Sequence, residues 1–167
     1  HYGLDPHTGT HDMIIRNNTV HDNGSTGIIC SLDCYNTTIE DNKVYNNTKW
    51  GINMSDSVAR NNIVSNELRG IIVSESHDNE LYNNTVSSSG SGIEVYEDSY
   101  DNITHDNIMI DILDPSDALS VENGAAEENT FYSNVLFDMD GNRIDLGEES
   151  MQEGLSDVDS DNSETND

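Results

Sequence analysis

The fold of this chain is decided by one stretch, residues 62–73, which reads Asn62-Ile63-Val64-Ser65-Asn66-Glu67-Leu68-Arg69-Gly70-Ile71-Ile72-Val73. It holds two short β-branched runs, one led by an asparagine and one by a glycine, with a polar turn between them. Asparagine-led runs recur at Asn18, Asn42, Asn84 and Asn107, and glycine-led runs recur at Gly27, Gly51 and Gly92. Both markers keep intervals of 19 to 24 residues, which indicates a repeat architecture.

Each repeat also holds a third short run before its asparagine, such as Glu80-Leu81-Tyr82. The three runs are too short and too strictly alternating to be helices. Three strands with their turns make one coil of about 22 residues, and stacked coils pair in parallel at about 4.8 Å. The sequence therefore predicts an all-β fold, a right-handed parallel β-helix of about five to six coils.

Alternation within the glycine-led runs assigns each side chain to a face. The inward set is predicted to be Ile28, Cys30, Ile52, Met54, Ile71, Val73, Ile93 and Val95. The outward set is predicted to be Ile29, Asn53, Ile72 and Glu94. The repeated asparagines are expected to stack at the turns as hydrogen-bonded ladders.

Composition favours a solenoid over a two-layer globule. The 167 residues are 33% hydrophobic and carry a formal net charge of −27, and a solenoid buries only a thin apolar stripe in each coil. Such acidity argues against nucleic acid or an anionic membrane surface as a partner. No apolar run approaches the ~18 residues of a membrane span, so we expect no membrane insertion.

The chain begins at His1 with no visible signal peptide, and we interpret it as a fragment or mature piece whose upstream sequence is missing. One domain is expected over residues 1–149, followed by a disordered acidic tail over residues 150–167. The runs at residues 129–132 and 134–137 are expected to close the helix and cap its end.

The two cysteines, Cys30 and Cys34, are too few for a disulfide framework. Cys30 falls at an inward strand position, which favours a small buried residue with a free thiol. A local bridge between the two is the alternative, and it requires the strand to bend.

An acidic cluster follows the last runs, at Asp138, Asp140, Asn142, Ile144 and Glu149. Its oxygen spacing is similar to positions 1, 3, 5, 7 and 12 of a calcium loop. Gly141 stands two places before the position where such a loop carries its glycine. Calcium is therefore the one cofactor that the sequence suggests, and a solvated acidic turn is the alternative.

A second motif opens the chain, Tyr2-Gly3-Leu4-Asp5-Pro6-His7. It places a phenol, a carboxylate and an imidazole close together, and its proline stiffens the turn. Three proton-handling groups on one stiff loop beside a regular scaffold are typical of an active site. The alternative is a polar turn whose groups bond only to its own backbone.

This motif and the coil repeat together resemble the alginate (mannuronan) C5-epimerases and their relatives, right-handed parallel β-helices related to polysaccharide lyases. The resemblance covers about residues 1–110. It implies that Tyr2 and His7 form the acid/base pair, that Asp5 is the catalytic carboxylate and that an acidic polysaccharide is the partner.

The chain departs from the family pattern at the end of the next glycine-led strand. Where some members carry an active-site aspartate, this chain has Ser31, with Asp33 two residues on. Where others carry an arginine, it has Leu32. Lys49 matches the basic residue that the family places before the following glycine.

C5 epimerisation takes a proton from a uronate and returns one on the opposite face. The neighbouring carboxylate must be neutralised as charge builds up, and Lys49 is the nearest candidate, with Arg69 next. Trp50 and Arg69 should line one edge, where an apolar face beside a charge suits a sugar acid. A tryptophan that only caps the coil edge is the alternative. The predicted substrate-binding residues are Ser31, Asp33, Lys49, Trp50 and Arg69.

We expect the phenol and imidazole to share a trough with the lysine one coil later. If the intermediate instead expels the 4-linked sugar, the same site is a lyase. A non-catalytic carbohydrate-binding or surface β-helix is a further interpretation, as is a subunit that self-associates through its open coil end. The charge of −27 repels a polyanion at long range, and salt or calcium would reduce that repulsion. The expected location is extracellular or on the cell surface.

Overall fold

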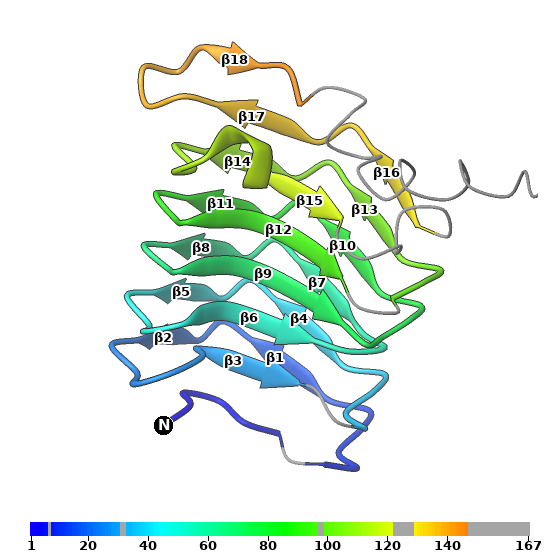
Figure 1. The fold of residues 1–167 in the computed structure, drawn as a ribbon. Helices are drawn as coiled ribbons and strands as arrows, with labels where there is room; N and C mark the ends of the chain where they lie inside the picture. Colours follow the sequence, from blue (N-terminus) through cyan, green and yellow to red (C-terminus); the bar gives the residue numbers. More distant parts are fainter. Residues whose placement is uncertain (7, 31–32, 97–98, 122–128, 147–167) are drawn as a thin grey trace, which may run out of the picture.

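The computed structural model describes residues 1–6, 8–30, 33–96, 99–121 and 129–146. Over these residues the chain winds as a parallel β-solenoid of about five turns (Figure 1). The predicted parallel β-helix is therefore confirmed. The acidic tail expected at residues 150–167 lies outside the described residues.

Three sheets run along the solenoid, and the described coils contribute their strands to them in turn (Figure 1). The first sheet contains β1 (Ile14–Arg16), β4 (Thr38–Glu40), β7 (Val58–Arg60), β10 (Glu80–Tyr82), β13 (Ile103–His105) and β16 (Thr130–Tyr132). The second contains β2 (Thr19–His21), β5 (Lys43–Tyr45), β8 (Ile63–Ser65), β11 (Thr85–Ser87), β14 (Ile108–Ile110), β17 (Val135–Phe137) and β18 (Arg143–Ile144). The third contains β3 (Ile28–Cys30), β6 (Trp50–Met54), β9 (Arg69–Ser74), β12 (Ser91–Tyr96) and β15 (Leu119–Val121).

The register stacks chemically alike residues into columns. In the third sheet the inward column is Ile28, Ile52, Ile71 and Ile93, and all four are fully buried. Valines form the corresponding column of the second sheet, at residues 20, 44, 64 and 86. Fully burying such a side chain contributes about 1.5–3 kcal/mol, so these columns hold the coils together.

An asparagine ladder runs along the corner between the first and second sheets, as predicted. At Asn62 the backbone N–H and the side-chain Nδ2 donate to Asn84 Oδ1, at 3.1 and 2.9 Å. Asn62 Nδ2 also donates to the Ile39 carbonyl at 2.8 Å. The same linkage joins Asn18, Asn42, Asn62, Asn84, Asn107 and Asn134.

The residue before each ladder asparagine turns the corner with a left-handed backbone. Asn61 has φ 54° and Asn83 has φ 53°. Asparagine and aspartate tolerate this region better than other side chains, because their short polar groups bond locally. This accounts for the recurring Asn-Asn and Asp-Asn pairs.

The glycine that marks each repeat is required by close approach between coils. A Cβ at Gly70 would collide with the Gly92 carbonyl oxygen and with Val86 Cγ1. Any side chain there would push the next coil away, so the position accepts only glycine.

The expectation of a free thiol at Cys30 is wrong, because Cys30 and Cys34 form a disulfide with a Cα–Cα distance of 5.2 Å. Both residues are fully buried. The bridge starts at the last residue of β3, Cys30, so it lies at the end of the strand.

The C-terminal end is covered by a hairpin. β18 pairs antiparallel with β17, and Ile144 and Leu146 pack against the core. A short 3₁₀ helix, η1 (Pro115–Asp117), precedes β15. In the part of the chain that the structure describes, no helix is long and apolar enough to cross a membrane.

Candidate functional site

The outer face of the third sheet is hollowed. Its outward row is Ile29, Asn53, Ile72 and Glu94, paired from coil to coil and alternating with core residues as predicted. Yet Asn53 and Glu94 are each only 5% exposed, and Ile72 is fully buried. Outward side chains with so little exposure form the floor of a concavity.

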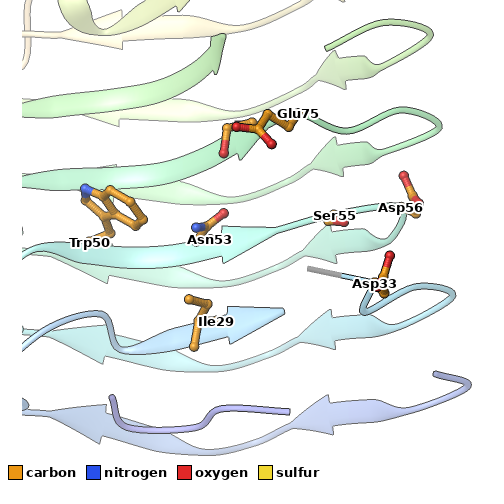
Figure 2. A pocket seen from close by; sticks show the side chains of 8 residues that line it. Ile29, Asp33, Trp50, Asn53, Ser55, Asp56 and Glu75 are labelled. Atoms are coloured by element: carbon orange, nitrogen blue, oxygen red, sulfur yellow. The ribbon is translucent and has the colours of Figure 1, made fainter. Parts of the chain in front are cut away.

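A groove of about 440 Å³ lies over β3, β6 and β9, and we call it the third-sheet groove (Figure 2). It is lined by Ile29, Asp33, Trp50, Asn53, Ser55, Asp56, Ser74 and Glu75. In Figure 2 the Trp50 ring lies toward one end, and Asp33 and Asp56 lie toward the other. Among these described lining residues none is basic, so the groove combines an apolar end with an anionic end.

The three groove carboxylates come from chain corners that follow the strands. Asp33, Asp56 and Glu75 have φ of 65°, 44° and 49°. Aspartate tolerates this left-handed region, whereas glutamate adopts it rarely. Asp56 Oδ1 accepts hydrogen bonds from Ser76 Oγ at 3.2 Å and from the His77 N–H at 3.1 Å. The side chains of Asp33 and Glu75 are exposed.

Asn53 holds a buried acceptor at the floor of the groove. Its Oδ1 has no hydrogen-bond partner within the described structure. Most buried polar atoms in proteins are paired, so an unpaired one in a groove indicates a place for a ligand group. Ser55 beside it differs, because its hydroxyl donates to the Cys34 carbonyl at 3.3 Å.

A second hollow of about 300 Å³ lies further along the same sheet, and its lining includes Leu68, Arg69, Ser91 and Glu94. Arg69 Nη1 forms an ion pair with Glu94 Oε2 at 3.1 Å. Arg69 is the register partner of both Trp50 and Ser91, so these residues line one edge, as predicted. The two hollows therefore follow one another along the third sheet.

The N-terminal motif extends the third sheet by one more coil. The Leu4 N–H donates to the Gly27 carbonyl at 2.8 Å, and the Ile29 N–H donates to the Leu4 carbonyl at 2.9 Å. Together these bonds form a parallel bridge between Leu4 and Ile28. The motif is therefore attached to the sheet that carries the groove.

Counting from that bridge gives the register of the predicted catalytic residues. Asp5 falls opposite Ile29, on the outward row, and Tyr2 falls opposite Thr26, which in turn lies opposite Trp50. Both predicted residues have exposed side chains. His7 and Ser31 lie outside the described residues.

Lys49 is exposed and directly precedes Trp50. Tyr2 lies one coil before Thr26, and Thr26 lies one coil before Trp50. The lysine, next to Trp50, is therefore two coils from the phenol. The expectation of a one-coil separation is therefore wrong, because the motif occupies a coil of its own below β3.

The predicted calcium loop forms a tight turn between β17 and β18. The Asp138 carboxylate accepts bonds from the Asp140 N–H at 2.9 Å and from the Asn142 N–H and Nδ2, both at 2.8 Å. The Asn142 bonds are the main cause of the lowered pKa of Asp138. Glu149 lies outside the described residues, so calcium binding here stays a prediction.

Glu67 is a titratable group that sequence reasoning did not single out. It follows Asn23 and Asn47 in a second ladder, at the corner between the second and third sheets. There Glu67 Oε1 accepts from Asn47 Nδ2 at 2.8 Å, and Oε2 accepts from the Asn47 N–H at 3.0 Å. Burial raises the pKa of Glu67 to about 7, against the lowering effect of these two bonds. Glu67 is therefore a carboxyl group that titrates near neutrality.

Sequence reasoning also missed the groove residues Asn53, Asp56 and Glu75 as site candidates. A signal was present for Asn53, because an amide at an outward position between two isoleucine-bearing coils is out of pattern. Asp56 and Glu75 follow strand ends, where acidic residues occur in almost every coil, so position alone does not distinguish them.

The stacked coils, the asparagine ladder and the open groove define a parallel β-solenoid with a groove on one sheet. Residues 7–150 match the family described as "Periplasmic copper-binding protein (NosD)". The chain belongs to this family.

Part of this chain is similar in sequence to a small part of several curated proteins. The mannuronan C5-epimerase of Pseudomonas putida is 37% identical over 89 residues, which are 50% of this chain and 17% of that protein. The mannuronan C5-epimerase of Pseudomonas syringae pv. tomato is 37% identical over 91 residues, 51% of this chain and 17% of that protein. The mannuronan C5-epimerase AlgE5 of Azotobacter vinelandii is 31% identical over 111 residues, 66% of this chain and 9% of that protein. No solved structure matches the chain.

The family description mentions copper, and the described residues do not fit such a site. They contain no group of three or more His, Cys, Asp or Glu side chains placed to hold a metal ion. Both cysteines, the softest ligands available, are joined in the disulfide.

Proposed function

We propose that this chain is part of a polysaccharide-acting β-helix protein that exchanges the C5 proton of a uronate. The supporting observation is the bridge between Leu4 and Ile28, which attaches the motif to the sheet that carries the groove. By register, Asp5 falls on the outward row that holds Ile29 and Asn53, and Tyr2 falls at the level of Trp50. Partial similarity to proteins named mannuronan C5-epimerase supports the same reaction.

In this proposal Tyr2 and His7 take and return the C5 proton, and the Asp5 carboxylate holds their orientation. A positive charge must offset the substrate carboxylate while the carbanion forms. Lys49 is two coils from Tyr2, about 10 Å by strand spacing, so its long side chain has to extend along the face to do this. Trp50 offers an apolar surface for the ring of a neighbouring sugar unit.

Two other functions remain as alternatives. If the intermediate expels the 4-linked sugar, the same groups perform β-elimination and the protein is a lyase. A non-catalytic carbohydrate-binding role is favoured by one observation, the ion pair that already engages Arg69 with Glu94. Self-association through the coil end stays a prediction.

The proposed location is outside the cytoplasm, at the cell surface or in the periplasm. The disulfide between Cys30 and Cys34 supports it, because such bonds persist in oxidising compartments. The family description names a periplasmic protein, which agrees.

The test is hydrogen exchange at C5. The chain is incubated in deuterated water with polymannuronate and, separately, with a polysaccharide that mixes uronates with neutral sugars, and deuterium at C5 is followed by NMR. We expect exchange that is lost in His7→Ala and reduced at least about 100-fold in Tyr2→Phe. A new unsaturated uronate signal would identify the lyase.

His21→Ala serves as the matched control, because His21 is an exposed imidazole on β2, away from the third sheet. It should leave exchange unchanged. Absence of exchange and elimination on every uronate offered, with glycan binding retained, would leave the non-catalytic role.

A further inference from the structure

The charged groups of the third-sheet groove are all hydrogen-bond acceptors. Asp33, Asp56 and Glu75 present carboxylates, which accept and do not donate when ionised. Asn53 presents its unpartnered Oδ1, and the Ser55 proton is engaged with a backbone carbonyl. A ligand that complements this lining must supply donors.

Asn53 is the group that points to a ligand most directly. It is 5% exposed and its Oδ1 has no partner within the described structure, although it lines an open groove. Figure 2 places its amide on the same face as the Trp50 ring and between that ring and the acidic end. A donor on a bound molecule would pair an acceptor that is otherwise buried without a bond.

The charge of the groove excludes a carboxylate as the natural occupant. Three carboxylates line it and no basic residue does so among those described. A uronate placed here would add a fourth negative charge with no cation in contact, which is unfavourable in a partly desolvated groove. Lys49 and Arg69 instead lie at the opposite ends of their strands from the acidic corners.

Trp50 supplies the remaining requirement of a sugar site. Its ring is partly exposed and lines the groove beside Ile29. A flat apolar surface next to directional acceptors matches a pyranose ring, which has an apolar face and a rim of donors.

We propose that the third-sheet groove binds a sugar unit that carries hydroxyl or amino donors and no carboxylate. This inference rests on the proposed function. It specifies the substrate as a heteropolysaccharide, in which uronates alternate with non-acidic sugars, instead of a homopolymer of uronate.

The test compares binding of three trisaccharides to the chain at low salt by titration calorimetry: mannotriose, the fully deacetylated chitosan trimer and trimannuronate. We expect at least one of the first two to bind about tenfold or more tightly than trimannuronate. Mannotriose and the chitosan trimer distinguish a hydroxyl-bearing from an amino-bearing unit. Equal or tighter binding of trimannuronate would overturn the proposal.

Two groove variants locate the binding. Trp50→Ala and Asn53→Leu, checked for folding by circular dichroism, should each weaken the preferred non-acidic trimer at least about fivefold. If folded Asn53→Leu binds it as tightly as the unchanged chain, the site lies elsewhere and the proposal fails.

A matched pair of aspartates separates the groove charge from the overall charge. Asp33 and Asp41 are both exposed and have φ of 65° and 55°, but only Asp33 lines the groove. Asp33→Asn should reduce the difference in binding affinity between the preferred trimer and trimannuronate. Asp41→Asn should leave that difference unchanged. Equal effects would show that net charge alone sets the preference.

The binding readout is independent of turnover. A chain that binds non-acidic trimers in the groove without exchanging C5 protons keeps this inference and loses the proposed reaction. A chain that exchanges C5 protons on polymannuronate and binds trimannuronate more tightly keeps the proposed reaction and loses this inference.

Discussion

Buried asparagines differ in their bonding between the ladder that joins the first and second sheets and the floor of the third-sheet groove. In the ladder, Asn62 bonds to the coils on both sides and is fully buried. In the groove, Asn53 is 5% exposed and its Oδ1 bonds to nothing in the described structure. The same side chain therefore joins coils in one region and leaves an acceptor unpaired in the other.

The first sheet shows that a polar outer face need not be a site. There Arg60 donates to Glu40 Oε2 at 2.6 and 2.8 Å and to the Tyr82 hydroxyl at 2.8 Å. His105 stacks between Tyr82 and Tyr132, with ring centroids 5.2 and 4.7 Å away. These groups satisfy one another along the stack, so the face is explained by structure alone.

The largest expected effect comes from replacing each asparagine by leucine. Asn62→Leu removes bonds to three residues and leaves buried backbone groups unpaired, and should lower the free energy of unfolding by about 3 kcal/mol or more. Asn53→Leu removes an unpaired acceptor and should change the free energy of unfolding by less than about 1 kcal/mol. Urea denaturation measures both. If both variants lost the same free energy of unfolding, the groove asparagine would be as structural as the ladder asparagine, and the contrast between the two regions would be wrong.

The second prediction concerns Glu67, where a carboxyl group occupies a ladder position. Its pKa in the folded chain is about 7, raised from the ordinary 4.5. The raised value means that the protonated form stabilises the fold fully below about pH 4.5 and that this stability is lost as the pH rises through about 7. The loss should amount to at most about 3 kcal/mol across that window.

Glu67→Gln tests this, because its amide cannot lose a proton and still accepts from Asn47. The variant should gain stability relative to the unchanged chain at pH 8 and show little difference at pH 5. Thermal unfolding at a series of pH values measures the effect. Parallel profiles for the two proteins would show that Glu67 does not titrate in this range.

The smallest effect is expected at Glu75 on the groove side. Its φ of 49° is unfavourable for glutamate, and asparagine suits that backbone better. Glu75→Asn should therefore raise the free energy of unfolding by about 0.5–1 kcal/mol while weakening the binding of an amino sugar. A lower free energy of unfolding would indicate that Glu75 supports the fold. Glu75 would then be a structural residue and not a ligand-binding residue of the groove.

The sequence was sufficient for the fold because the fold is periodic. Asn62 and Gly70 recur for reasons that act in every coil, the ladder bond and the close approach of the next strand. Local patterns of this kind can be recognised in the sequence without knowledge of contacts between distant residues.

The groove was less predictable because it depends on how unlike residues of separate coils meet. Asn53 is unusual only beside Ile29 and Ile72, its partners in the adjacent coils, and the register decides which residues those are. The disulfide was only the alternative prediction for a similar reason, because the sequence alone does not show that β3 ends at Cys30. The motif residues Tyr2 and Asp5 stood out as candidates because their chemistry is concentrated in one short segment, and their catalytic role stays a prediction.

The corners of the coil differ in how much their length varies. From the first sheet to the second, five positions separate the central strand residues in each described coil, as from Ile39 to Val44. From the third sheet back to the first, the separation is eleven positions after Ile28 and seven after Ile52. The length of the chain between strands thus varies at the rim of the groove and stays constant at the corner between the first and second sheets. A change of length at the rim can therefore alter the shape of the groove without disturbing the corner that keeps the coils in register.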